Sequence, residues 1–198
     1  NNNDPIGGFI LIRKMIEKYQ WPNINHKAYY NLLYQFAHHG HIQHTLTLYK
    51  HIELHLKQIN IVLMNAILTV YSYNANKDDS HNIIELTKTL LLDMKANNLN
   101  ANAQTYTLLI TIFHYSQRID LIEKVCLQME QHTYGQYKPS IQPYIALLPA
   151  LFQLSTPLKA LQLLERIDLV GLRPDMTFLT TLLKHIIVLK EYTLAEEI

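Results

Sequence analysis

The side chains best suited to chemistry are histidines gathered in the first third of the chain. His44, His51 and His55 recur at spacings that bring them near one face of a helix, and imidazole is a common metal ligand. The stretch HIELH does not match the H-E-x-x-H arrangement of zinc proteases, because Glu53 follows His51 by two residues rather than one. No cysteine lies nearby to complete a site. We therefore predict a solvent-facing helix surface here, and no bound metal.

Candidate catalytic groups are sparse. Cys126 lies on the apolar stripe of an expected helix, which indicates a small buried packing residue. Asp78 and Asp79 are adjacent carboxylates in a polar turn, but metal-dependent nuclease chemistry would need partner carboxylates at a defined spacing. The sequence has no glycine-rich phosphate loop. These observations predict a segment that is not an enzyme and that binds no cofactor.

The composition allows a packed core and makes no strong demand for a partner. The chain has 198 residues, of which 48% are apolar and 17% charged, so it can bury enough surface to fold. Its 17 lysines and arginines nearly balance 16 acidic residues, and a net charge of +1 does not require nucleic acid. No apolar run reaches the roughly 18 residues of a membrane span. The first residue is not methionine, so we expect a fragment that has lost any targeting peptide.

Proline and glycine mark the helices most clearly after residue 140. Pro157 suits the first turn of a helix, and Gly171 and Pro174 suit its end. The preceding apolar helix begins near Pro143 and contains Pro149, which should bend it or force a break. The resulting unit is a helix, a short turn, a second helix and a closing turn with proline.

This helix pair repeats along the chain. Residues 26–60 and 141–175 each span 35 positions, and the 42 and 38 positions of the two copies between them place the extra residues in turns. A single helix pair cannot bury its apolar stripe, so stacked copies must share a core. Second helices are expected to open at Ile42, Ile84, Ile119, Pro157 and Tyr192. The predicted array is a second-helix remnant at 9–25, full copies at 26–60, 61–102, 103–140 and 141–175, and a partial copy at 176–198.

The register resembles that of pentatricopeptide repeats. The first helix TYTLLI at 105–110, the second helix ending at Met94 and the closing Gly-Leu-x-Pro-Asp at 171–175 carry the resemblance. A tetratricopeptide array is the competing interpretation, but its W-x2-L-G-x2-Y pattern is absent. The resemblance covers nearly the whole chain. It implies an all-α fold, a right-handed α-solenoid of helix-turn-helix repeats whose first helices line a concave groove.

Function follows from the same resemblance. Pentatricopeptide proteins are mostly organellar and bind single-stranded RNA, so the resemblance implies RNA processing, stability or translation in the mitochondrial matrix. One repeat can read one base with two or three side chains. In the family these are the fifth and last residues of the repeat, and the second residue is usually an apolar side chain that sandwiches bases. Transferred to this chain, the contacts are Tyr30, Asn60, Asn65, Asn102, Thr107, Ser140, Asp175 and Thr180 at fifth and last places, and Val62 at a second place.

Several positions depart from the family pattern. Ile145 occupies a fifth place and cannot hydrogen-bond a base, and Tyr30 stands where a small polar residue is expected. Among the second residues only Val62 is apolar, while Lys27 at another second place offers a cation. We therefore expect one or two repeats to read bases and the others to contact the RNA backbone or nothing.

Residues further along the same helical faces extend the predicted groove. Tyr34 and Lys184 lie four residues after fifth places and offer a stacking ring and a cation. The tyrosines would otherwise pack between repeats with their hydroxyls facing water. Four residues further come His38, Tyr73, Tyr115, Gln153 and Val188.

Two classes of function stay open at this stage. Single-stranded RNA binding follows from the register and from the polar and aromatic groove. A protein-interaction or structural role, as a segment of a mitoribosomal protein or a mitochondrial RNA polymerase, follows from the near-neutral charge and the incomplete code.

Overall fold

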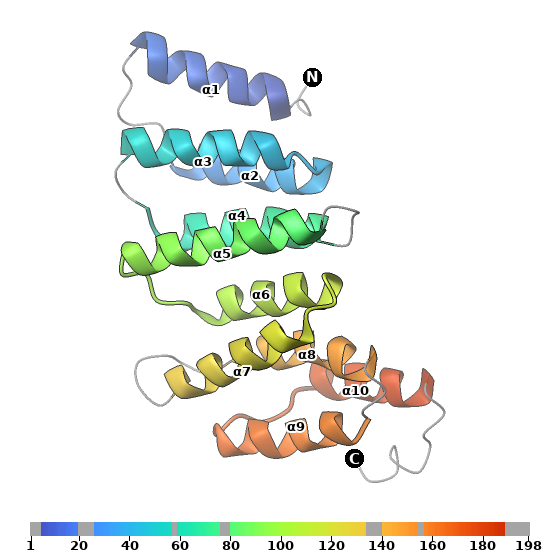
Figure 1. Cartoon of the computed structure of the whole chain (residues 1–198). Coiled ribbons are helices and arrows are strands. Elements are labelled where there is room, and N and C mark those ends of the chain that lie inside the picture. The colour runs from blue at the N-terminus through green and yellow to red at the C-terminus, as the bar shows by residue number, and fades with distance from the viewer. Residues whose placement is uncertain are drawn as a thin grey trace. The chain divides into compact units, whose positions relative to one another are not determined.

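The computed structural model describes residues 5–19, 26–56, 59–75, 80–133, 140–153 and 157–188. These residues form an all-α structure of ten helices in two compact units, one within residues 1–100 and the other within 101–198 (Figure 1). None of the described helices combines the length and the apolar character needed to cross a membrane.

The first unit alternates between two layers of helices. It contains α1 (Pro5–Tyr19), α2 (His26–His39), α3 (Ile42–Leu56), α4 (Ile61–Asn74) and α5 (Ser80–Ala96). The most extensive packing is between α2 and α4, which are the first helices of two successive predicted repeats. In Figure 1 α3 lies in front of α2, and α5 lies in front of α4. The α2 and α4 helices therefore form one layer, and the second helices cover it.

The second unit is built in the same way. It contains α6 (Ala103–Tyr115), α7 (Ile119–Thr133), α8 (Gln142–Gln153), α9 (Pro157–Leu169) and α10 (Met176–Val188). Here α8 packs against both α6 and α10, while α7 packs on α6 and α9 packs on α8. The layer of first helices in this unit is therefore α6, α8 and α10.

The apolar pairs at the seventh and eighth places of each predicted repeat form the core. Leu33, Ile67, Leu68, Ile110 and Leu148 are less than 1% exposed. Full burial of one such side chain stabilises the fold by about 1.5–3 kcal/mol. Buried members of these pairs, from the first helices of both units, are Leu32, Leu33, Ile67, Leu68, Leu109, Ile110, Leu147, Leu148 and Leu182.

The expected starts of the second helices are confirmed except at α5. Helices α3, α7 and α9 begin at Ile42, Ile119 and Pro157, whereas the predicted Tyr192 lies outside the described residues. The prediction that Ile84 opens α5 is wrong, because this helix begins at Ser80. Within the added turn Ile83 is buried, so continuing the helix backwards removes more apolar surface from water.

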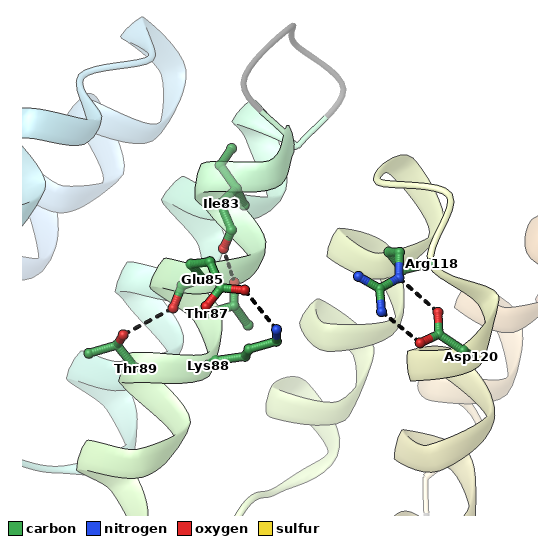
Figure 2. Close-up of polar contacts among 7 residues, drawn as sticks. All are labelled: Ile83, Glu85, Thr87, Lys88, Thr89, Arg118 and Asp120. Carbon is green, nitrogen blue, oxygen red and sulfur yellow. Dashed lines mark hydrogen bonds and ion pairs between the residues drawn. The ribbon is translucent and has the colours of Figure 1, made fainter.

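The threonines of α5 show how its polar side chains are accommodated. Thr87 is buried and donates its hydroxyl to the Ile83 carbonyl at 2.7 Å, and Thr89 does the same to Glu85 at 3.0 Å (Figure 2). The exposed Lys88 ammonium lies 2.7 Å from the Glu85 carboxylate. These bonds within one helix allow a buried hydroxyl without an energetic penalty for a missing partner.

Pro149 does not break its helix, contrary to one of the two outcomes expected for it. Helix α8 continues from Gln142 to Gln153 through the proline. Pro149 lacks the amide that would bond the Ile145 carbonyl, but only one intrahelical bond is lost so near the helix end. The buried neighbours Leu148 and Ala150 hold this turn in the core.

In the part of the chain that the structure describes, four helices end on a residue in the left-handed conformation. Gly40, Asn98, Gln117 and Gly171 have φ values of 72°, 53°, 55° and 77°. After each of them the next amide bonds back to a carbonyl in the last turn, as in the 2.8 Å bond from Arg118 to Phe113. This is the usual glycine-favouring end of a helix, and it makes the turn into the next helix short.

Beyond Gln117, an ion pair closes the turn into α7. The Arg118 guanidinium donates two hydrogen bonds to the Asp120 carboxylate, at 2.8 and 2.7 Å (Figure 2). Those hydrogen bonds hold the pKa of Asp120 below its ordinary value. An acidic residue in the first turn of α7 also suits the positive end of the helix dipole.

Candidate nucleic-acid interface

Two of the predicted last-place residues cap a first helix. The Asn60 side-chain oxygen accepts a hydrogen bond from the Leu63 amide at 2.9 Å, at the start of α4. Asn102 does the same for the Thr105 amide at 3.0 Å, and the Thr105 hydroxyl accepts from the Asn102 amide at 3.1 Å in return. A short side-chain acceptor is favoured here because the first amides of a helix have no partner within it.

The other two last-place residues lie at equivalent positions in the second unit. Asp175 accepts from the Phe178 amide at 2.7 Å, at the start of α10. Ser140 lies just before α8 and accepts from the Gln142 amide over a longer distance of 3.4 Å. Every predicted last-place residue therefore lies at the N-terminal end of a first helix, and its polar type serves helix formation as well as any contact with RNA.

The first full repeat joins its two predicted base-reading residues directly. The half-buried Tyr30 donates its hydroxyl to the Asn60 side-chain oxygen at 3.1 Å. That oxygen therefore accepts two hydrogen bonds, one from α2 and one from α4. The contact fixes the amide group of Asn60 in one orientation at the N-terminus of α4.

The remaining fifth-place residues differ in accessibility. Asn65 is only 2% exposed, so its side chain lies in the core of the first unit. Thr107 is half-buried and Thr180 is exposed, and each donates its hydroxyl to a backbone carbonyl one turn earlier, at 2.8 and 2.6 Å. The two threonine oxygens are left with acceptor capacity, which suits the amino or imino donors of a base. Ile145 is half-buried and contributes apolar surface.

The predicted second-place and groove residues provide apolar and cationic contacts. Val62 is 54% exposed near the start of α4, and Lys184 is exposed on α10. The side chain of Lys27 lies outside the described residues.

An exposed group of rings extends the first-helix layer of the first unit. Tyr34 and His38, one turn apart on α2, have ring centroids 4.5 Å apart in an edge-to-face arrangement. His38 lies 5.1 Å from Tyr73 of α4, and the two tyrosines are 55% and 48% exposed. The structure thus joins Tyr34 to two residues of the next predicted row into a surface on which bases could stack.

The second unit has a hollow that was not predicted. It lies between the C-terminal ends of α6, α8 and α10, and His114, Gln117, Phe152 and His185 contribute to its lining. Tyr115, Gln153 and Val188 of the predicted outer row line it as well. One feature of the sequence could have pointed to this hollow: Gln117 occupies the fifteenth place of its repeat, where the first full copy has Gly40.

His44 and Cys126, two of the side chains considered for chemistry, pack against other residues of the fold. Among the described residues no group of three histidine, cysteine or acidic side chains could hold a metal ion. The prediction of a solvent-facing surface is wrong for His44, which is half-buried because its ring packs against Phe9 and Phe36, with centroids 6.2 and 5.8 Å apart. Cys126 is buried, as predicted, and burial raises the pKa of its thiol to about 11. The side chain of His55, and both Asp78 and Asp79, lie outside the described residues.

The alternating layers and capped first helices define an α-helical repeat fold, and comparisons with known proteins show which repeat proteins it is similar to. Residues 89–151 match the pentatricopeptide repeat domain. The match covers about a third of the chain, and the fold as a whole is similar to that of solved pentatricopeptide repeat proteins. No curated protein sequence matches the chain.

Solved structures of pentatricopeptide proteins share this fold at low sequence identity. PPR10 from maize superposes with a TM-score of 0.68 at 17% identity, over 98% of this chain and 29% of PPR10. PPR10 in complex with an 18-nucleotide psaJ RNA element gives a TM-score of 0.67 at 19% identity, over 89% of this chain and 25% of PPR10. The domain of Arabidopsis thaliana protein-only RNase P 1 in complex with tRNA gives 0.62 at 17% identity, over 83% of this chain and 82% of that one.

Proposed function

We propose that this chain binds single-stranded RNA through its first helices, and that it serves RNA processing, stability or translation in the mitochondrial matrix. The observation that carries the proposal is the contact between Tyr30 and Asn60. It brings the fifth and last residues of one repeat together at a helix N-terminus. The RNA named in two of the similar solved structures supports the same class of ligand.

The chemistry of the first helices suits a weakly charged, base-contacting interface. Helix N-termini carry partial positive charge and attract phosphate, and here they coincide with the last-place residues. Exposed rings such as Tyr34 offer stacking, which tolerates any base. With a net charge of only +1, a modest dependence of affinity on salt is expected.

The test is fluorescence anisotropy with labelled single-stranded RNA homopolymers at low salt. Val62→Asp places a negative charge on an exposed apolar residue of α4, and we expect it to weaken binding about tenfold by repelling phosphate. Leu127→Asp is the matched control, because Leu127 is similarly exposed at 57% but lies on the second helix α7. Absence of binding to any RNA, or equal effects of both variants, would contradict the proposal.

A protein-interaction role within a larger mitochondrial machine is the alternative, and a cleft on the second helices favours it. The cleft lies between α7 and α9, has a volume of about 370 Å³ and includes Cys126, Leu127 and Leu151 in its lining. Co-purification of the mitochondrial ribosome or RNA polymerase after nuclease treatment would support this role. Here Leu127→Asp should abolish the contact and Val62→Asp should leave it intact, the reverse of the RNA outcome.

The proposed compartment has a separate test. Microscopy of the tagged protein beside a marker of the mitochondrial matrix should show overlap. Exclusion of the tagged protein from mitochondria would contradict the proposed compartment while leaving RNA binding open.

A further inference from the structure

The hollow of the second unit has the size and lining of a small ligand site. Its volume is about 520 Å³, and it lies where α6, α8 and α10 end. Known pockets for small ligands fall in the same size range, with apolar walls and a few polar groups that fix orientation. Six of its residues carry the following argument: His114, Tyr115, Gln117, Phe152, Gln153 and His185.

The walls of the hollow present flat rings. Phe152 and His185 stack with centroids 5.0 Å apart and an interplanar angle of 22°. Tyr115 stands at the edge of the hollow and is 48% exposed. A planar ligand can add to such a stack or lie against the tyrosine face.

Polar groups in the lining can read the edge of that ligand. His185 Nδ1 lies 2.8 Å from the Thr181 carbonyl, which can only accept, so this nitrogen carries the hydrogen. In the neutral ring Nε2 is then an acceptor. The side-chain amides of Gln117 and Gln153 each add a donor and an acceptor.

The hollow favours an uncharged ligand over a phosphate. Its lining contains no lysine, arginine, aspartate or glutamate among the described residues. Burial lowers the pKa of His114, and the neighbouring His185 lowers it further, which favours the neutral form of its ring. A neutral, aromatic and partly polar lining fits a nucleobase.

The backbone at Gln117 keeps a side chain at a position where glycine would be less strained. Gln117 holds φ at 55° in a turn where the first repeat uses Gly40 with φ at 72°. A residue other than glycine, asparagine or aspartate is strained in this region by about 1 kcal/mol. Glycine would relieve that strain but would remove a side chain from the hollow.

We propose that this hollow binds one unstacked nucleobase of a bound single-stranded RNA, with the ring against Tyr115 or the Phe152–His185 stack and its edge facing Gln117. The inference rests on the proposed RNA binding and adds a subsite to it. Tyr115 follows the fifth-place Thr107 by eight residues, which is about 12 Å along a helix. The base in the hollow is therefore a different base from the one at Thr107.

The subsite is tested with two variants of the full chain. Tyr115→Ala removes the aromatic ring on which the base would stack, and we expect it to lower RNA affinity at least fivefold. Gln117→Gly is expected to weaken RNA binding severalfold while raising the midpoint of thermal unfolding, because glycine relieves the left-handed turn. Reduced binding by a more stable variant cannot be attributed to misfolding.

A direct readout uses adenosine, which carries a base but no phosphate. Millimolar adenosine should shift the ring proton signals of His114 and His185 in NMR spectra of the wild type. The shift should persist in Tyr73→Ala, which removes an equally exposed tyrosine of the first unit, and should be lost in Tyr115→Ala. Inorganic phosphate at the same concentration should produce no such shift.

The outcomes separate the subsite from the function on which it depends. If RNA binds to the wild type but Tyr115→Ala and Gln117→Gly bind it equally well, the subsite is overturned and RNA binding stands. If phosphate rather than adenosine shifts the two histidine signals, the subsite is overturned as well. If the wild type binds no RNA, both proposals fail.

Discussion

The Tyr30 hydroxyl donates a hydrogen bond to the Asn60 side-chain oxygen at 3.1 Å, across 30 residues of chain. The two residues come from α2 and from the residue that caps α4, so the bond ties the first helix of one repeat to the start of the next. The unusual tyrosine at this fifth place therefore has a structural explanation. The same contact holds the Asn60 side chain, which we propose as a base contact, in one orientation.

Removing that hydroxyl should cost stability with little change in shape. Tyr30→Phe is expected to lower the free energy of unfolding by about 0.5–1.5 kcal/mol, the usual net value of one hydrogen bond. Chemical denaturation monitored by circular dichroism measures it. Tyr34→Phe is the control, because the ring of Tyr34 is largely exposed, and it should change stability much less. Equal losses for both variants would contradict the structural role of the Tyr30 hydroxyl.

The double role of Asn102, as helix cap and predicted base contact, can be separated by two substitutions. Asn102→Ala removes the acceptor for the Thr105 amide and should cost about 0.5–2 kcal/mol of stability. Asn102→Asp keeps that acceptor but removes the amide donors, so stability should be retained while the base preference of RNA binding changes. Denaturation and binding to RNA homopolymers give the two measurements. A base preference that is unchanged in Asn102→Asp would show that this residue only caps α6.

The sequence was sufficient for the fold because its periodic signals are redundant. Buried pairs such as Ile67 and Leu68, and helix starts such as Ile42 and Pro157, were predicted from spacing and were found in the structure. The start of α5 was not predicted correctly, because the inserted residues were assigned to a turn. In the structure part of the insertion extends the helix by one turn, and this extension buries Ile83.

The candidate site was less predictable, since register does not determine exposure. Asn65 and Thr180 occupy the same place in their repeats, yet the first is buried and the second is exposed. The hollow depends on residues from three helices and on the backbone conformation of Gln117. Spacing within one repeat carries no information on the exposure of a side chain or on the presence of the hollow.

An ion pair should couple the second helices of the second unit. The Arg166 guanidinium of α9 bonds the Glu130 carboxylate of α7, and the two side chains are 37% and 21% exposed. A double-mutant cycle with Arg166→Met and Glu130→Gln should give a coupling energy of about 0.5–1 kcal/mol that falls with added salt. The control is the more exposed Lys88–Glu85 pair within α5, where about 0.3 kcal/mol is expected. A coupling no larger than that of the control would contradict a role in joining α7 to α9.

Stability should fall in mild acid because of His114. Burial and the neighbouring His185 lower its pKa in the folded chain, whereas the unfolded ring titrates near its ordinary value of about 6.5. Above that value both states are neutral and stability is unaffected. Below it the unfolded chain takes up the proton first, so the free energy of unfolding decreases until the folded ring is also protonated.

The measurement is urea denaturation at pH 7.5 and pH 5.5. His114→Gln should lose less stability between these values than the wild type does, because its side chain has no proton to gain. His41, whose pKa is also lowered, contributes a change of the same sign in both proteins and does not affect the comparison. An identical decrease in the variant and the wild type would show that His114 does not contribute.

Cys126 should report the opening of the second unit. It is the only cysteine of the chain, it is buried on α7, and burial raises the pKa of its thiol to about 11. Thiolate is the reactive form, so iodoacetamide at pH 8 should label the folded chain far more slowly than the chain in urea. The labelling rate should then rise with urea before the global transition if the unit opens locally. Labelling of the folded chain at the unfolded rate would show that α7 does not stay packed, and it would contradict the buried position of this thiol.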